Sequence, residues 1–191
     1  MIKTFDYQNG EIKITYNEFP IVKDYKYDWK KYQIEIMTFP VSLNYRLAVE
    51  LKIQKGARIC YGMLGVQVQP DEDINSVKIE VAFTQGNSIR YYDSCLFNDS
   101  RVYKGLPEEY VEAVIRKVTS EILKRDKYPQ YKILFEYAAN CEVGSSSMIY
   151  ELISEIIINI ISESICEKIM DMDIESFTQR FANNVNLHYF H

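Results

Sequence analysis

The alternation of apolar and polar residues divides the chain into a strand-rich first half and a helix-rich second half. The clearest strand covers residues 43–53, where alternate positions are apolar and the positions between them are mostly polar. This pattern indicates a sheet with one buried face and one wetter face. Asn9-Gly10, between two short β-prone segments, predicts a two-residue hairpin. Further strands are predicted at residues 12–16, 32–39, 63–68, 77–83 and 133–137.

Helical spacing of apolar residues predicts two long helices in the second half. Pro107 is expected to open the first helix, because the N–H that proline lacks is not needed at a helix start. Glu112 and Arg116 are spaced for an i,i+4 ion pair on this helix. Its predicted buried stripe is Val111, Val114, Ile115, Val118 and Ile122.

The second helix is expected after residues 144–147, Gly-Ser-Ser-Ser, where a serine oxygen can accept a backbone N–H of the first turn. Its predicted buried face is Ile149, Leu152, Ile153, Ile156, Ile157, Ile160 and Ile161. A last short helix is expected at residues 174–182. The order of several strands, helix, strand and helix indicates an α+β fold, a two-layer sandwich with two helices packed on one face of a mainly antiparallel sheet.

Charge and composition narrow the range of partners. The 191-residue chain has 47% hydrophobic and 26% charged residues, which suits a globular protein with a substantial core. Its formal net charge of −5 opposes RNA binding by the chain as a whole, because such affinity comes largely from neutralising phosphates. A local basic patch is still compatible with this balance.

The positions of cysteine and histidine predict no metal site and no cofactor. The two histidines, His188 and His191, both lie in the C-terminal tail. No two cysteines have C-x-x-C spacing, so neither a zinc site nor a disulfide framework is indicated, and reduced, mostly buried thiols are expected. The four cysteines are Cys60, Cys95, Cys141 and Cys166.

The apolar segments do not have the form of a membrane anchor. Residues 1–6 lack the apolar core of a signal peptide. The most apolar stretch, residues 152–161, contains Ser154, Glu155 and Asn159 and is too short to cross a bilayer. These observations predict a soluble, cytoplasmic protein with no membrane contact.

Two segments resemble the fourth domain of elongation factor G. Residues 52–62, Lys-Ile-Gln-Lys-Gly-Ala-Arg-Ile-Cys-Tyr-Gly, are similar to K-x-Q-S-G-G-R-G-Q-Y-G of that domain, which is followed by a strand and E-P. Residues 105–114, Gly-Leu-Pro-Glu-Glu-Tyr-Val-Glu-Ala-Val, resemble I-P-x-E-Y-I-x-A-V at the start of its first helix. The matching positions around the first segment are Lys52, Gln54, Gly56, Arg58, Tyr61, Gly62 and Pro70.

Two further matches extend the resemblance over residues 40–164. Tyr128-Pro129 is similar to the G-Y-P-V that precedes the next strand, and residues 142–148, Glu-Val-Gly-Ser-Ser-Ser-Met, resemble D-V-D-S-S-E-M before the second helix. The resemblance implies a left-handed β-α-β unit, an exception to the usual crossover hand. It also implies kinship with the tetracycline ribosomal-protection GTPases, and a role at the ribosome or with the translation machinery.

The implied organisation has three parts. Residues 1–39 are expected to form a β-hairpin and strand extension packed on the same domain, residues 40–168 the domain that resembles the elongation factor, and residues 169–191 a C-terminal helix and tail. Two loops depart from the family pattern. G-G-R-G-Q becomes Gly-Ala-Arg-Ile-Cys at residues 56–60, and the S-Y-H-D tip becomes a shorter hairpin at residues 138–142, Ala-Ala-Asn-Cys-Glu, which has no histidine.

The candidate contacts for RNA or a protein partner lie in residues 52–62 and in the shorter hairpin at residues 138–142. Three basic residues within residues 52–62 can form a strip beside a tyrosine, which suits contacts with phosphates and stacking on a base. The competing interpretation is an ordinary solvated sheet face. The candidate residues are Lys52, Lys55, Arg58, Tyr61, Asn140 and Cys141.

A weaker candidate is a phosphate site at Gly144, Ser145 and Ser146, because small residues at a helix N-terminus can bind phosphate. Small-molecule kinases of related fold use a Gly-Ser-Ser motif at this place. Helix capping is the competing interpretation, and Glu142 would repel a phosphate.

No catalytic set is evident in the sequence. A G-x-x-x-x-G-K-[ST] loop is absent, and no histidine lies inside the domain to act as a general base. The sequence therefore predicts a non-enzymatic protein that resembles the fourth domain of elongation factor G. The alternatives are a protein-interaction or inhibitor-like module on the same scaffold, with the ribosomal role lost, and a small-molecule kinase of related fold.

Overall fold

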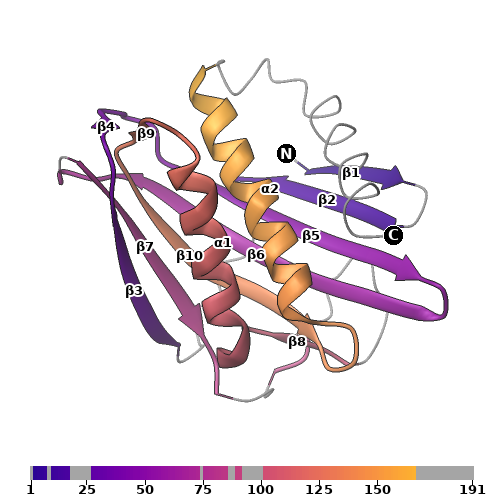
Figure 1. Cartoon of the computed structure of the whole chain (residues 1–191). Helices are drawn as coiled ribbons and strands as arrows, with labels where there is room; N and C mark the ends of the chain where they lie inside the picture. The colour runs from indigo at the N-terminus through magenta and orange to yellow at the C-terminus, as the bar shows by residue number, and fades with distance from the viewer. Residues whose placement is uncertain are drawn as a thin grey trace.

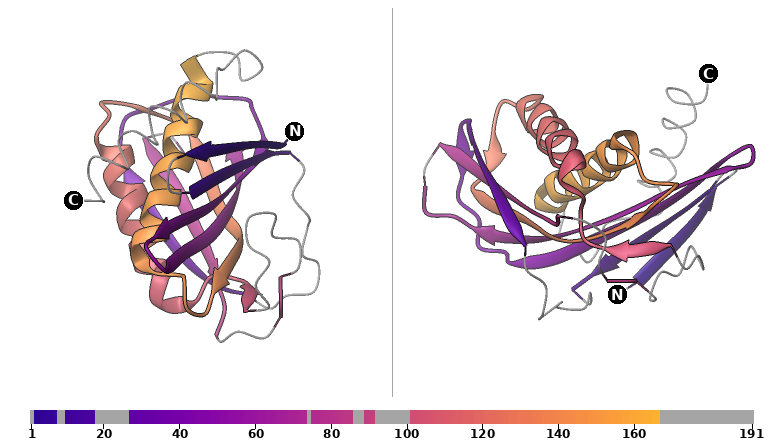
Figure 2. Two further views of the ribbon diagram at one scale, coloured as in Figure 1. Left: turned by 90° about the vertical axis from the view of Figure 1, so that its right-hand side faces the viewer. Right: turned by 90° about the horizontal axis from the view of Figure 1, so that it is seen from below.

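The computed structural model describes residues 2–7, 10–17, 27–73, 75–85, 89–91 and 101–166. Figure 1 shows these residues as a curved sheet with two helices on one face, and Figure 2 shows that the sheet curves around the helices. The helix expected at residues 174–182, both histidines, and the expected C-terminal part at residues 169–191 lie outside the described residues.

The sheet is mixed and mostly antiparallel. Its path is β1 (Ile2–Tyr7), β2 (Gly10–Tyr16), β5 (Tyr45–Lys55), β6 (Arg58–Pro70), β10 (Tyr131–Cys141), β7 (Ser76–Phe83) and β3 (Asp28–Glu35). All neighbours on this path are antiparallel except β10 and β7. The short strand β8 (Val102–Lys104) pairs with residues 139–141 of β10, beyond the segment 132–135 that pairs with β7. These strands confirm the expected α+β class.

The two helices begin where the sequence predicts and bury the predicted faces. The 3₁₀ turn η1 (Glu108–Tyr110) follows Pro107 and leads into α1 (Val111–Leu123), and α2 is Ser147–Cys166. Every residue of both predicted stripes is buried. Between the helices, β9 (Tyr128–Pro129) pairs in parallel with β4 (Thr38–Phe39).

The ion pair predicted within the first helix is wrong. Arg116 pairs with Glu151 of α2, and Glu112 pairs with Lys30 of β3. Both partners come from elements that pack beside α1. The i,i+4 rule describes only neighbours within one helix, so it does not account for partners on other elements. The charged residues of α1 therefore connect the helix to its neighbours.

The strand β5 buries the apolar positions of the alternating pattern seen in the sequence. Tyr45, Leu47, Val49, Leu51 and Ile53 point toward the helices and are buried, as predicted. Leu43 lies before the strand and is 48% exposed. On the other side of β5, Ala48 and Glu50 are also buried, so the far face (the sheet face away from the helices) is not simply a wet surface.

A second apolar cluster covers part of the far face. It contains Ala48, Tyr61, Met63, Tyr91, Val102, Tyr137, Ala139 and Cys141. Its residues come from β5, β6, β8, β10 and the segment 89–91, which reaches β8 through a hydrogen bond from the Tyr91 N–H to the Val102 carbonyl. Burial on both faces explains why β6 and the end of β10 are buried almost continuously.

Strands from the N-terminal segment, residues 1–39, lie at both edges of the same sheet. β1 and β2 extend it beyond β5, and β3 forms the edge beyond β7. Tyr7 pairs with Gly10, so Gly10 is the first residue of β2 rather than part of the hairpin loop. The strand predicted at residues 32–39 starts earlier and is interrupted, because the chain leaves β3 after Glu35 and turns toward β9 at β4.

The helix α2 lies very close to the sheet at one point. A Cβ built on Gly62 of β6 would come within 2.5 Å of the Ile149 Cγ2 and 3.2 Å of the Ile153 Cδ1. Only a residue without a side chain allows this approach. Among the described residues, neither helix has both the length and the apolar character needed to cross a membrane.

Candidate functional site

The β5–β6 hairpin carries the first loop that the sequence singles out. Lys55 pairs with Arg58 at its end, and Gly56 adopts a φ of 61°, a left-handed conformation that glycine accepts without strain. Ala57 and Arg58 are exposed. The hairpin extends beyond the helices and past the ends of the neighbouring strands (Figures 1 and 2), so within the described part of the chain no helix or strand covers its tip.

Lys52 does not form a continuous basic strip with the tip. Its Nζ donates to the Glu11 Oε2 at 2.7 Å, across the β2–β5 pair. This cross-strand ion pair offsets the charge of Lys52 on the far face. Among the side chains that the structure describes, which do not include that of Lys55, Arg58 carries an exposed positive charge at the hairpin tip.

Tyr61 lies on the β6 strand of the hairpin, three residues after Arg58, and is fully buried in the far-face cluster. Its hydroxyl donates to the Glu50 Oε1 at 2.7 Å, and the Lys13 Nζ lies 3.9 Å from the Glu50 Oε2. Because Glu50 is only 3% exposed, these contacts are what make its burial tolerable. As folded here, Tyr61 presents no ring surface for stacking.

The turn between β10 and α2 closes on the base of the hairpin. The Tyr61 N–H donates to the Gly144 carbonyl at 3.1 Å. The Ser145 Oγ donates to the Tyr61 carbonyl at 2.7 Å and accepts the Cys141 N–H at 2.8 Å. The structure thus brings Tyr61, Cys141, Gly144 and Ser145 together, through backbone groups and one hydroxyl.

The same turn uses its donors internally. The Gly144 and Ser145 N–H groups both donate to the Cys141 carbonyl, at 3.2 and 3.0 Å. The Ser146 carbonyl accepts the Ile149 N–H at 3.1 Å at the start of α2. The Ser145 hydroxyl joins the turn to β6 instead of capping the helix. Phosphate binding at this turn stays a prediction, with these donors already engaged inside the chain.

Asn140 and Cys141 do not lie at an exposed hairpin tip. The segment expected to form a short hairpin, residues 138–142, is strand up to Cys141, because β10 pairs there with β6 on one side and β8 on the other. Both residues are buried, and the Asn140 Nδ2 donates to the Gly105 carbonyl at 3.0 Å. The exposed residues of this region are Glu142 and Val143.

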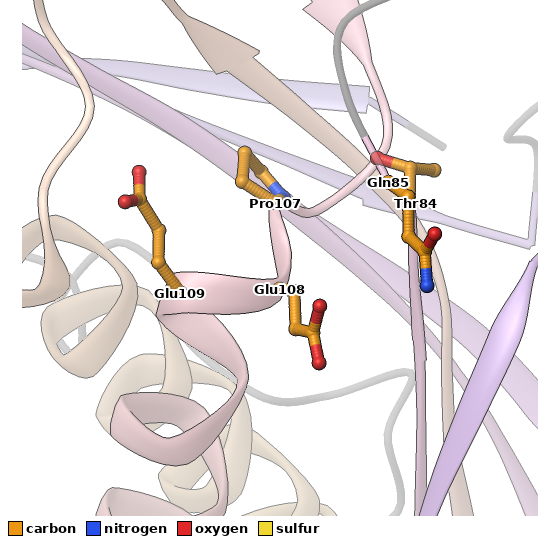
Figure 3. Close-up of a pocket in the computed structure, with 5 residues that line it drawn as sticks. All are labelled: Thr84, Gln85, Pro107, Glu108 and Glu109. Carbon is orange, nitrogen blue, oxygen red and sulfur yellow. The ribbon is translucent and has the colours of Figure 1, made fainter.

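A pocket that the sequence did not single out lies where β7 ends and η1 begins. It has a volume of ≈ 680 Å³ and is lined by Thr84, Gln85, Pro107, Glu108 and Glu109. In Figure 3, Glu108 and Gln85 lie on one side of the η1 backbone, and Glu109 points away from them. The two glutamates also lie at the start of the helical segment, where negative charge is favourable. The acidic lining of the pocket disfavours phosphates and other anions.

Two observations bear on the chemistry of the described residues. No three His, Cys, Asp or Glu side chains among them gather in an arrangement that could hold a metal ion. Cys60 and Cys141, the two cysteines whose side chains the structure describes, are free thiols. Neither a protein-family model nor a curated protein sequence matches this chain.

Sequence reasoning missed the partners of the predicted site residues. Glu50 and Glu11 sit at polar positions of two neighbouring strands, each opposite or diagonal to a residue of the predicted site. Their alternation with apolar residues was visible in the sequence, but the pairing of β2 with β5 was not. That pairing determines which charges at the hairpin are already neutralised.

Proposed function

We propose that this chain is a non-catalytic relative of the fourth domain of elongation factor G, and that it contacts the ribosome through the tip of the β5–β6 hairpin. The observation that carries the proposal is the projecting hairpin with Arg58 exposed at its end. Arginine suits phosphate contacts because its planar group donates two parallel hydrogen bonds to them.

The order of the elements supports the kinship. The segments that resemble the elongation factor fall on the β5–β6 hairpin, the start of η1 and α1, the strand β9, and the turn before α2. These are the structural junctions at which the family has its motifs. β10 lies between β6 and β7 in the sheet.

The path from β7 through α1 to β10 supports the left-handed unit that the kinship implies. The two strands are parallel neighbours. In Figure 1 the helices lie in front of the sheet, both strands run downward, and β10 lies to the right of β7. For strands that run downward with the helix in front, a right-handed crossover would step to the left.

The negative net charge of the chain restricts contact with RNA to a small part of its surface. With a net charge of −5, only a surface that projects away from the bulk acidic charge can approach RNA at moderate salt. The hairpin satisfies this condition, because its tip extends beyond the helices and the remaining strands.

Co-sedimentation with purified ribosomes across a salt series tests the proposal. The wild-type chain should pellet with ribosomes, and less so as salt increases. Arg58→Glu should weaken binding by on the order of tenfold and lower the slope of log affinity against log salt by about one. Lys127→Glu is the matched control, since Lys127 is exposed and directly precedes β9, which Figure 1 shows far from the β5–β6 turn.

The outcomes separate the possibilities clearly. Equal losses for Arg58→Glu and Lys127→Glu would mean that net charge, not the hairpin, governs binding. No pelleting of the wild-type chain at low salt would overturn the ribosomal role. Circular dichroism and thermal unfolding of both variants establish that each has folded.

A further inference from the structure

The strand β3 forms one edge of the sheet and offers an unusual surface. It pairs with β7, and within the part of the chain that the structure describes no strand lies on its outer side. Of its eight residues only Ile34 is buried. Trp29 is 41% exposed and Tyr32 is 47% exposed, both large values for side chains of this kind.

The hydrogen bonds of β3 determine which backbone groups face outward. The Ile36 N–H donates to the Asn75 carbonyl at 3.1 Å, on the β7 side. Inward and outward directions alternate along an antiparallel strand. The N–H and C=O groups of Trp29, Lys31, Gln33 and Glu35 therefore point away from the sheet.

We propose that a second copy of this chain pairs with β3 in antiparallel orientation, with the two Gln33 residues facing each other on the two-fold axis. In this register Lys31 of each copy lies opposite Glu35 of the other, and Tyr32 lies opposite Ile34. An isologous pair of this kind repeats each contact twice. The sheet then continues from one copy into the next.

Charge selects this register from its neighbours. A pair centred on Lys31 places two lysines face to face, which is unfavourable. A pair centred on Tyr32 keeps the direction of the hydrogen bonds but places Lys31 opposite Gln33 and Glu35 opposite Trp29, without any ion pair. Of these three registers, only the one centred on Gln33 joins opposite charges on both sides of the axis.

Lysines often protect a sheet edge from such pairing, but here their charges are accommodated. Lys30 pairs with Glu112 on the helix side. Lys31 is 70% exposed, and its Nζ lies 3.5 Å from the Glu80 Oε1. The same oxygen has a closer cation in Lys132, at 2.9 Å, so Lys31 can turn to a partner without leaving Glu80 unpaired.

A charge-reversal series tests the pairing. Sedimentation equilibrium of the wild-type chain should show a dimer whose population increases with concentration. Lys31→Glu and Glu35→Lys should each raise the dissociation constant by on the order of tenfold, because two symmetry-related pairs become repulsive. The double variant Lys31→Glu/Glu35→Lys restores opposite charges across the axis and should recover the wild-type constant.

A cross-link at the axis supplies a second readout. Gln33→Cys should form a disulfide between copies under mild oxidation, since facing residues of a hydrogen-bonded antiparallel pair have Cα atoms about 5.5 Å apart, within the range for a disulfide. Leu123→Cys is the control, because Leu123 is exposed on α1 and is not part of the β3 edge. Cross-linking of the Gln33→Cys variant that only matches the control, a double charge variant that stays monomeric, or a wild-type monomer at millimolar concentration would overturn the proposal.

Discussion

On the helix face of the sheet, β5, β6 and β10 present aliphatic side chains such as Val49, Leu64 and Ile133 to α1 and α2. On the far face the same three strands present two tyrosines, a methionine, a buried glutamate and small residues. The first face is stabilised by close packing of apolar surface. The second depends in addition on hydrogen bonds that satisfy the buried polar groups. The two faces should therefore respond differently to mutation.

The β5–β6 hairpin is held in place by different kinds of contact on its two faces. Its helix side is held by α2, which lies against the Gly62 backbone. Its far side is held by the Tyr61 hydroxyl on Glu50, and its backbone by the Ser145 hydroxyl on the Tyr61 carbonyl. Packing fixes the distance between the layers, and the polar contacts fix the hairpin's direction.

The largest expected effect is truncation on the helix face. Leu64→Ala should lower the free energy of unfolding by about 2–5 kcal/mol, because it removes buried methyl groups and leaves a cavity. Leu64 is 1% exposed. Urea unfolding measures the change, and Leu123→Ala, on the exposed surface of α1, is the control with a small expected loss. Comparable losses for both would contradict the assignment of the core.

The next effect sharpens the comparison with a single atom on each face. Tyr61→Phe should cost about 1.5–3 kcal/mol, because it removes a hydrogen bond to a buried carboxylate. Tyr131→Phe, on the helix face, should be nearly neutral or stabilising, since its buried hydroxyl has no hydrogen-bond partner in the described part of the chain. Equal losses in chemical denaturation would show that the polar contact is not what distinguishes the far face.

A smaller, pH-dependent effect concerns the helix layer. Burial favours a higher pKa for Glu121, but hydrogen bonds from Lys124 and Lys117 outweigh it and hold the pKa below the ordinary value. A lowered carboxyl pKa stabilises the fold above the unfolded-state pKa, and this stabilisation is lost as the pH falls through the folded-state pKa. Unfolding midpoints between neutral pH and about pH 3 should therefore fall less steeply for Glu121→Gln than for wild type. Parallel curves would contradict this role.

The smallest effects should come from two neighbouring residues of β3 that point to opposite faces. Lys30→Ala removes a pair with Glu112 on the helix side, and Lys31→Ala removes a pair with Glu80 on the far side. Each should change stability by less than about 1 kcal/mol, because exposed ion pairs are weak. The free energy of unfolding is measured on dilute protein. A larger loss from either variant would indicate that its ion pair contributes more to stability than an exposed pair normally does.

The parts of the fold with strong periodicity could be predicted from the sequence. The alternation in β5 and the apolar stripes of α1 and α2 both correspond to buried faces, because a single period accounts for each. The end of β10 could not be predicted. Residues 138–141 are small or polar and show no alternation, and their strand geometry comes from pairing with β6 and β8.

The candidate site was predictable only as a set of loops. The hairpin turn at Gly56 follows from its sequence, and the turn before α2 follows from its glycine and serines. The contacts of Lys52 and Tyr61 depend on Glu11 and Glu50, which pairing between distant strands brings near. Local patterns report which residues can be charged or buried, but not which long-range partner satisfies them.

The short distance between α2 and the sheet depends on the absence of a Cβ atom at Gly62. Any side chain there would push against Ile149 near the start of α2. The displacement would pass to the adjoining Ser145 turn and from there to the strand that carries the hairpin. Gly62, which lies away from the turn of the β5–β6 hairpin, thus influences the position and direction of the hairpin tip.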